Sequence, residues 1–106
     1  MDVRSIDHVN LRVPDDGVDP AVEFYRDRLG FDVEGLERYR EGDKPFFDVR
    51  LAPAHVLHLW PSEAFEPPSG NSYDHVALVV EADIEAVKEW LAAADVPVES
   101  ELESPL

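Results

Sequence analysis

The sequence predicts one α+β domain built from a repeated βα unit, and three observations support this prediction. Several short segments alternate apolar and polar residues, which is the period of a half-buried strand. Two other segments place apolar residues on one face at helical spacing. The tripeptide Asp7-His8-Val9 recurs as Asp74-His75-Val76, 67 positions later, and both copies continue with a turn, a helix and a strand. The chain of 106 residues has room for one such domain.

The first unit opens with a strand expected over residues 6–14. Alternation turns its apolar side chains toward a helix and its polar ones to the opposite face. The polar set is His8, Asn10 and Arg12. Asp19-Pro20 predicts the start of that helix and Gly30 its end, because the helical apolar spacing runs to about Leu29. Three more strands are expected over residues 32–40, 46–51 and 55–60.

The second unit is expected to be incomplete. Residues 1–61 form the first βαβββ module, residues 62–72 a linker rich in Pro, Ser and Gly, and residues 73–106 a partial second module. That module begins with a strand over residues 73–80, continues with a helix capped at Asp83, and starts a further strand at Val98. Its last two strands would fall beyond Leu106 at the spacing of the repeat. An open sheet edge favours cover by a second chain, so we predict a homodimer.

Composition excludes several classes of partner. The chain has 24 acidic and 9 basic residues, a net charge of −15, which disfavours nucleic acids and anionic membrane surfaces. No apolar run approaches the roughly 20 residues that span a bilayer. The absence of cysteine excludes disulfides, cysteine-ligated zinc and a thiol nucleophile, and it fits a cytoplasmic location. Abundant acids with few lysines suggest a salt-rich cytoplasm, with an ordinary acidic protein as the alternative.

Three histidines share the sheet face that points away from the helices. His8 and His75 occupy equivalent positions in the two repeats, and His58 lies in the fourth strand. His55 has the opposite parity and is left out. Imidazoles that converge from different strands are typical of a transition-metal site, usually completed by a carboxylate. The alternative is that each is a surface or hydrogen-bonded histidine, and the equivalence of the repeats favours the metal site.

Four sequence segments resemble the vicinal oxygen chelate superfamily, which includes glyoxalases, bleomycin-resistance proteins and extradiol dioxygenases. They read IDHVNLRVPD, AVEFYRDRLGF, HVLHLWP and YDHVALVVEADIEAVKEWL. The resemblance implies two βαβββ modules whose mixed sheet curls into a cup, with helices on the outer face. It also implies that His8, His58 and His75 bind a divalent metal such as Fe, Mn, Ni or Zn. The turn that usually precedes the last ligand, a glutamate, has no counterpart up to Leu106.

The resemblance implies a metal-dependent lyase, isomerase or dioxygenase acting on a small molecule with vicinal oxygens. Asn10 and Arg12 are expected to bind its polar group, and Trp60 to form an apolar wall. A surface ion pair is the alternative for Arg12, and either Phe46 or Phe47 is expected to face the cup. The cup face is expected to carry His, Asn and Arg rather than acids. Two other functions remain open: a metal-free small-molecule (antibiotic) binding protein of the bleomycin-resistance type, or an inactive truncated module.

Overall fold

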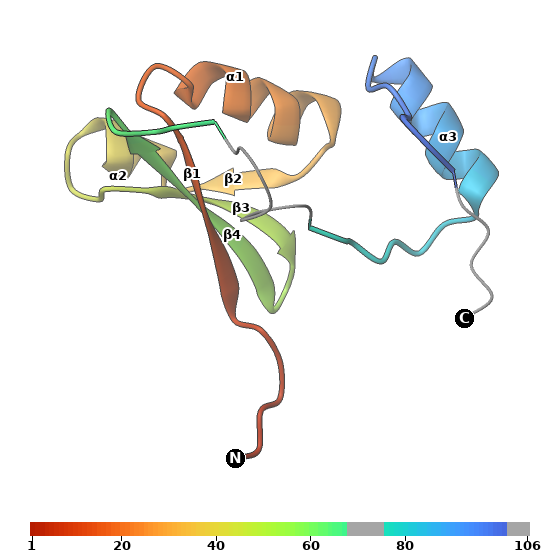
Figure 1. Cartoon of the computed structure of the whole chain (residues 1–106), viewed down its shortest axis with the longest axis horizontal. Coiled ribbons are helices and arrows are strands. Elements are labelled where there is room, and N and C mark those ends of the chain that lie inside the picture. The colour runs from red at the N-terminus through yellow and green to blue at the C-terminus, as the bar shows by residue number, and fades with distance from the viewer. Residues whose placement is uncertain (68–75, 102–106) are drawn as a thin grey trace.

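The protein folds into a four-stranded sheet with helices, as shown by a computed structural model that describes residues 1–67 and 76–101 (Figure 1). The strands are β1 (His8–Pro14), β2 (Asp32–Glu34), β3 (Phe47–Ala52) and β4 (His55–Ser62). The helices are α1 (Val18–Val22), which continues as the π-helical segment η1 (Glu23–Arg28), then α2 (Leu36–Arg40) and α3 (Ile84–Ala93). The predicted α+β class is therefore confirmed.

The sheet order is β1-β4-β3-β2. β1 runs parallel to β4, while β4 with β3 and β3 with β2 are antiparallel. This order places the first and the fourth strand side by side, although about 50 residues separate them in the chain. It also leaves β1 as one edge of the open sheet.

The core lies between the sheet and the α1–η1 helix, which covers one sheet face (Figure 1). Its fully or almost fully buried side chains are Val22, Phe47, Val49, Leu57 and Leu59. The four strand residues hold alternate positions in β3 and β4 and so point to the same side of the sheet. Val9 and Leu11 of β1 pack against this cluster, as the alternation predicts.

The first helix differs from the expectation at its start but not at its end. It begins at Val18 with Gly17 as the N-cap and no side-chain cap, so the predicted cap at Asp19 is wrong. The chain leaves the helix after Leu29 through Gly30, whose φ of 78° is left-handed, as expected of a helix end. In η1 the amide of Leu29 donates to the carbonyl of Phe24, the wider spacing of a π-helix.

The strand predicted over residues 32–40 is wrong after Glu34. Gly35 adopts a φ of 76°, and this left-handed residue ends β2 and serves as the N-cap of α2. Leu36 packs against the core from this short helix. A five-residue helix contains too little of the helical period for alternation to separate it from a strand.

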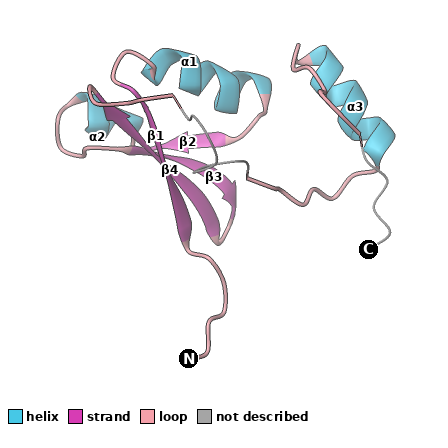
Figure 2. Ribbon diagram, in the orientation of Figure 1, coloured by secondary structure: helices cyan, strands magenta, loops and turns pink. Residues whose placement is uncertain are grey.

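The second repeat forms its helix but not its strands in the described residues. Residues 73–75 of the predicted strand lie outside the described part, and residues 76–80 adopt no regular structure (Figure 2). No strand begins at Val98 within the described residues either. A strand needs a neighbour for its backbone N–H and C=O groups, and no described strand pairs with residues 76–80. Helix α3 satisfies its own backbone and forms as predicted, with Asp83 accepting from the amide of Ala86 at 2.8 Å.

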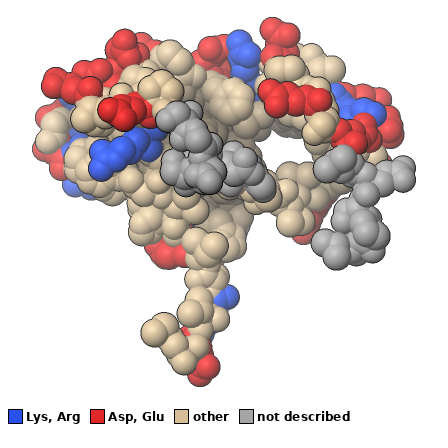
Figure 3. Space-filling model, in the orientation of Figure 1, with Lys and Arg blue, Asp and Glu red and all other residues tan. Residues whose placement is uncertain are grey.

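Helix α3 stands away from the sheet and contacts the end of η1 (Figure 1). The indole Nε1 of Trp90 donates to the carbonyl of Arg28 at 3.4 Å, and the Arg28 guanidinium donates to the carbonyl of Asp95 at 3.2 Å. Acidic side chains are spread over the helices, with basic ones among them (Figure 3). Within residues 1–67 and 76–101, no helix is long and apolar enough to cross a membrane.

Candidate functional site

The polar face of the sheet forms a pocket of about 480 Å³. Its lining consists of His8, Asn10, Arg12, Phe46, His58 and Trp60. Five of these six are site residues that strand alternation and the resemblance predict. The structure therefore brings the predicted residues of the first module together, while His75 lies outside the described residues.

The parallel register of β1 and β4 builds this pocket. Asn10 lies opposite His58 and Arg12 opposite Trp60, so the two polar faces meet along the strand pair. Buried Leu57 and Leu59 on the other face of β4 hold this register, because a slip by one residue would expose them.

Four aromatic rings run across the floor of the pocket. The ring centroids of His8 and His58 are 4.1 Å apart, and those of His58 and Phe46 are 4.5 Å apart. Phe46 stacks on Trp60 at 5.0 Å with an interplanar angle of 20°. Phe46 is thus the phenylalanine that faces the pocket, whereas Phe47 is fully buried in the core.

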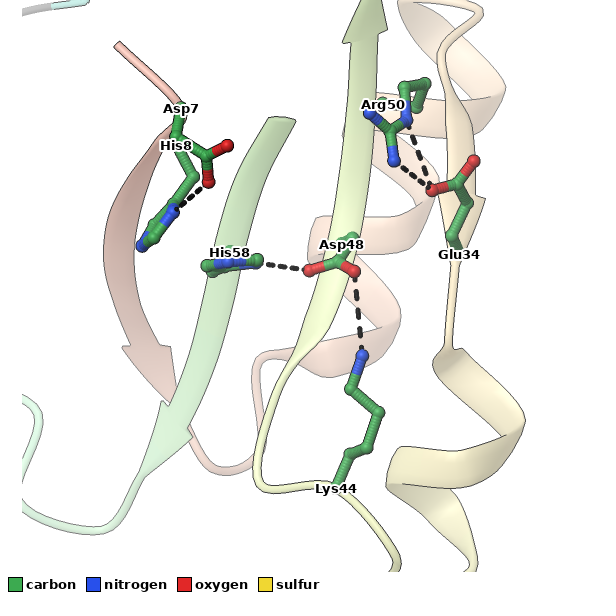
Figure 4. Close-up of polar contacts among 7 residues, drawn as sticks. All are labelled: Asp7, His8, Glu34, Lys44, Asp48, Arg50 and His58. Carbon is green, nitrogen blue, oxygen red and sulfur yellow. Dashed lines mark hydrogen bonds and ion pairs between the residues drawn. The ribbon is translucent and has the colours of Figure 1, made fainter. Parts of the chain in front are cut away.

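Each of the two pocket histidines contacts a carboxylate through Nδ1 (Figure 4). His8 donates to Asp7 at 2.8 Å, and His58 donates to Asp48. A carboxylate only accepts hydrogen bonds, so Nδ1 of each ring carries the proton. The Nε2 atoms take no part in these contacts.

The two carboxylate contacts differ in burial. The side chains of His58 and Asp48 are 19% and 16% exposed, whereas those of His8 and Asp7 are 44% and 94% exposed. The hydrogen bond from His8 lowers the pKa of the Asp7 carboxyl, and the charge of the imidazolium form acts in the same direction. Asp48 has a second partner, because the Nζ of Lys44 lies 3.6 Å from its other oxygen (Figure 4).

Acids therefore belong to this sheet face, which corrects the expectation that it carries only His, Asn and Arg. Asp48 and Glu34 lie opposite each other in β3 and β2. Glu34 accepts from Arg50 through two nitrogens, at 3.0 and 3.2 Å, and this hydrogen bonding raises the pKa of Arg50. The strand alternation already contained the signal: Asp48 sits between core residues Phe47 and Val49 and must point the other way.

Arg12 forms no ion pair with any residue in the ranges 1–67 and 76–101. The alternative of a surface ion pair for this residue thus finds no support in the described part of the chain. Its guanidinium remains available to an anionic or carbonyl group in the pocket.

His8 and His58 have the donor chemistry of two metal ligands. A metal-bound histidine commonly donates its second ring N–H to a carboxylate, the arrangement found here at both rings. The described residues contain no group of three or more His, Cys, Asp or Glu able to hold a metal. His75, the third predicted ligand, is not among the residues described.

A second hollow of about 440 Å³ lies at the start of β1. Most of its lining is apolar and includes residues 76–80 together with Phe31, Leu51 and Leu57. Its polar lining residues are Asp7, His8 and His55, and it shares His8 with the first pocket. The polar pocket is the candidate site, because both carboxylate-bound histidines line it together with Asn10 and Arg12.

Comparisons with known proteins identify the family and the fold. Residues 5–105 match the model of the Glyoxalase/Bleomycin resistance protein/Dioxygenase superfamily. The solved structure of SMU.1112c has a similar fold, with a TM-score of 0.62 and 24% sequence identity over 98% of this chain and 84% of that chain. No curated protein matches the sequence. The chain therefore belongs to the glyoxalase, bleomycin resistance protein and dioxygenase superfamily.

Proposed function

We propose that this chain is a metal-dependent enzyme of the glyoxalase or dioxygenase type that acts on a small molecule with vicinal oxygens. The observation that carries the proposal is the pair of imidazoles 4.1 Å apart, each with Nδ1 on a carboxylate. This pairing leaves two Nε2 nitrogens available in one pocket as ligands. We propose His8, His58 and His75 as the metal ligands, with Fe, Mn, Ni and Zn as the candidate metals.

A bound divalent metal supplies a Lewis acid for an oxyanion or, as redox iron or manganese, the means to activate dioxygen. The chain itself binds and orients the substrate. Arg12 offers two nitrogens to a carboxylate or carbonyl, and Asn10 offers an amide beside it. Trp60 and Phe46 form a stacked apolar wall that excludes water from one side of the bound molecule.

Metal titration tests this proposal. Metal-free protein is titrated calorimetrically with Mn²⁺, Ni²⁺ and Zn²⁺, and anaerobically with Fe²⁺. We expect one ion per site in the wild type and loss of binding in His8→Ala, His58→Ala and His75→Ala. His55→Ala is the matched control, because His55 lies in β4 but does not line the polar pocket. Absence of binding for all four metals contradicts the proposal.

A metal-free binding protein of the bleomycin-resistance type is the second candidate. The four adjacent rings of the pocket favour this second function, because aromatic rings bind planar ligands without a metal. Arg12, which forms no ion pair with the described residues, lies beside these rings and can contribute to the binding. This function predicts that ligand binding survives EDTA and His8→Ala but is weakened by Trp60→Ala. Binding that disappears with EDTA excludes it.

We also propose a homodimer and a salt-rich cytoplasm as the setting. Val79, Trp90 and Ile84 are 100%, 60% and 55% exposed, so the second repeat offers apolar surface that another copy can bury. Light scattering that reports a monomer in high salt contradicts the dimer. The excess of 24 acids over 9 bases supports the salt-rich setting, which predicts a melting temperature that rises with KCl concentration.

A further inference from the structure

The carboxylate of Asp48 lies beside His58, one of the two pocket histidines (Figure 4). Asp48 and His58 are paired residues of antiparallel β3 and β4. The neighbouring pairs on both sides, Phe47 with Leu59 and Val49 with Leu57, are buried in the core. The register is therefore fixed, and Asp48 cannot move along the sheet away from His58.

This contact determines which nitrogen of His58 faces the pocket. Asp48 accepts from Nδ1, so the neutral ring carries its proton on Nδ1 and keeps its lone pair on Nε2. A free imidazole side chain in water prefers the opposite tautomer, with the proton on Nε2. Both side chains are more than four-fifths buried, so water competes weakly for the hydrogen bond.

The surroundings hold both partners in place. The Nζ of Lys44 forms an ion pair with the second oxygen of Asp48 at 3.6 Å and lies 4.4 Å from the centroid of the Phe46 ring. The His58 ring is flanked by His8 at 4.1 Å and by Phe46 at 4.5 Å, which restricts its rotation. Gly35 permits the approach of Lys44, because a Cβ there would lie 3.2 Å from Nζ.

We propose that Asp48 is a positioning residue that fixes the tautomer and orientation of His58, so that Nε2 is presented to the pocket as a lone-pair donor. The role of Asp48 in metal binding rests on the proposed metal-dependent function, whereas the tautomer of His58 does not depend on that function. Asp7 holds His8 less firmly, because its carboxylate is 94% exposed and water competes for the hydrogen bond.

Long-range ¹H–¹⁵N correlation spectra of metal-free, ¹⁵N-labelled protein test the tautomer directly. In the wild type, His58 should show a protonated Nδ1 and an unprotonated Nε2. In Asp48→Ala the proton of His58 should move to Nε2, while the tautomer of His8 stays unchanged. The control Asp7→Ala should alter His8 alone. Should Asp48→Ala not fold, Asp48→Asn keeps the side-chain volume and should give a mixture of the two tautomers at His58.

Two results overturn the proposal: a His58 that already carries its proton on Nε2 in the wild type, or a tautomer that Asp48→Ala or Asp48→Asn leaves unchanged. Zn²⁺ titration gives a second readout. Loss of the carboxylate should weaken binding about 10–100-fold, and equal affinity in wild type and variant also overturns the proposal. If the wild type binds no metal, that result contradicts the proposed function but not the positioning role of Asp48. The expected shift of the His58 tautomer in Asp48→Ala would then still support that role.

Discussion

Two adjacent phenylalanines provide a direct test of which sheet face carries the pocket. Phe47 is 0% exposed and packs in the core with its ring 5.9 Å from that of Tyr39. Phe46 points to the opposite face, where it contacts His58 and Trp60. Replacing each by alanine removes the same atoms from two different environments.

The loss of stability should be larger for Phe47→Ala than for Phe46→Ala. Phe47→Ala creates a cavity in a closed core, and such changes cost about 3–5 kcal/mol. This loss is a large part of the free energy of unfolding of a typical domain, which is about 5–15 kcal/mol. Phe46→Ala removes two ring contacts worth about 0.5–1.5 kcal/mol each from a partly buried site, so we expect about 1–3 kcal/mol.

Urea denaturation followed by circular dichroism measures both values. The same protein samples are then titrated with Zn²⁺ to separate packing from site effects. Phe46→Ala should retain cooperative unfolding with a small shift in midpoint, and Phe47→Ala should lose most of its stability. A larger loss of stability for Phe46→Ala than for Phe47→Ala would refute the assignment of the two faces.

Three further changes test local features. Gly35→Ala should destabilise the fold by about 1–2 kcal/mol from left-handed strain, with a further loss because the new Cβ contacts the Lys44 ammonium. Gly42→Ala, at a φ of 85° with open space around its Cβ, should show the strain alone. Urea midpoints of the two variants compare these losses. The pKa of Asp7, followed by NMR, should lie below its ordinary value in the wild type and rise toward that value in His8→Ala, because the hydrogen bond from His8 is the main cause of the lowering. Because the folded-state pKa is the lower one, the contact stabilises the fold above that pH range and its effect disappears as the pH falls through the lowered value. Asp83→Ala removes the N-cap of α3, worth about 1 kcal/mol, and hydrogen exchange should accelerate in α3 while β3 and β4 keep their protection.

Much of the sheet was predictable, because alternation encodes which side chains share a face. This is how His8 and His58 could be assigned to one surface before their strands were known to be neighbours. Alternation does not encode pairing, so the contact between His58 and Asp48 became visible only with the register of β3 and β4. Distances between side chains on different strands depend on that register and on the twist of the sheet.

The wrong predictions have physical causes of the same kind. Residues 76–80 have the composition of a strand, but a strand is stable only beside another strand, and none is paired with them in the described residues. Leu36 belongs to a helix because left-handed Gly35 redirects the chain, a local event that the apolar pattern does not reveal. Helix α3, which supplies its own hydrogen bonds, was predictable from its cap and its apolar spacing.

The position of the pocket between the first and the fourth strand links ligand binding to the folding of the whole module. His8 and His58 are brought together by the pairing of β1 with β4, and β1 pairs with no other strand in the described part of the chain. Pairing of segments so distant in sequence is slow, because closing the long loop between them costs conformational entropy. A chain in which β1 and β4 are unpaired therefore lacks the site, and a ligand that bridges β1 and β4 joins the first and the last strand of the first module. Such a ligand, at 100 times its dissociation constant, would stabilise the module by about 2.7 kcal/mol, so the thermal stability of the sheet should itself report that the pocket is filled.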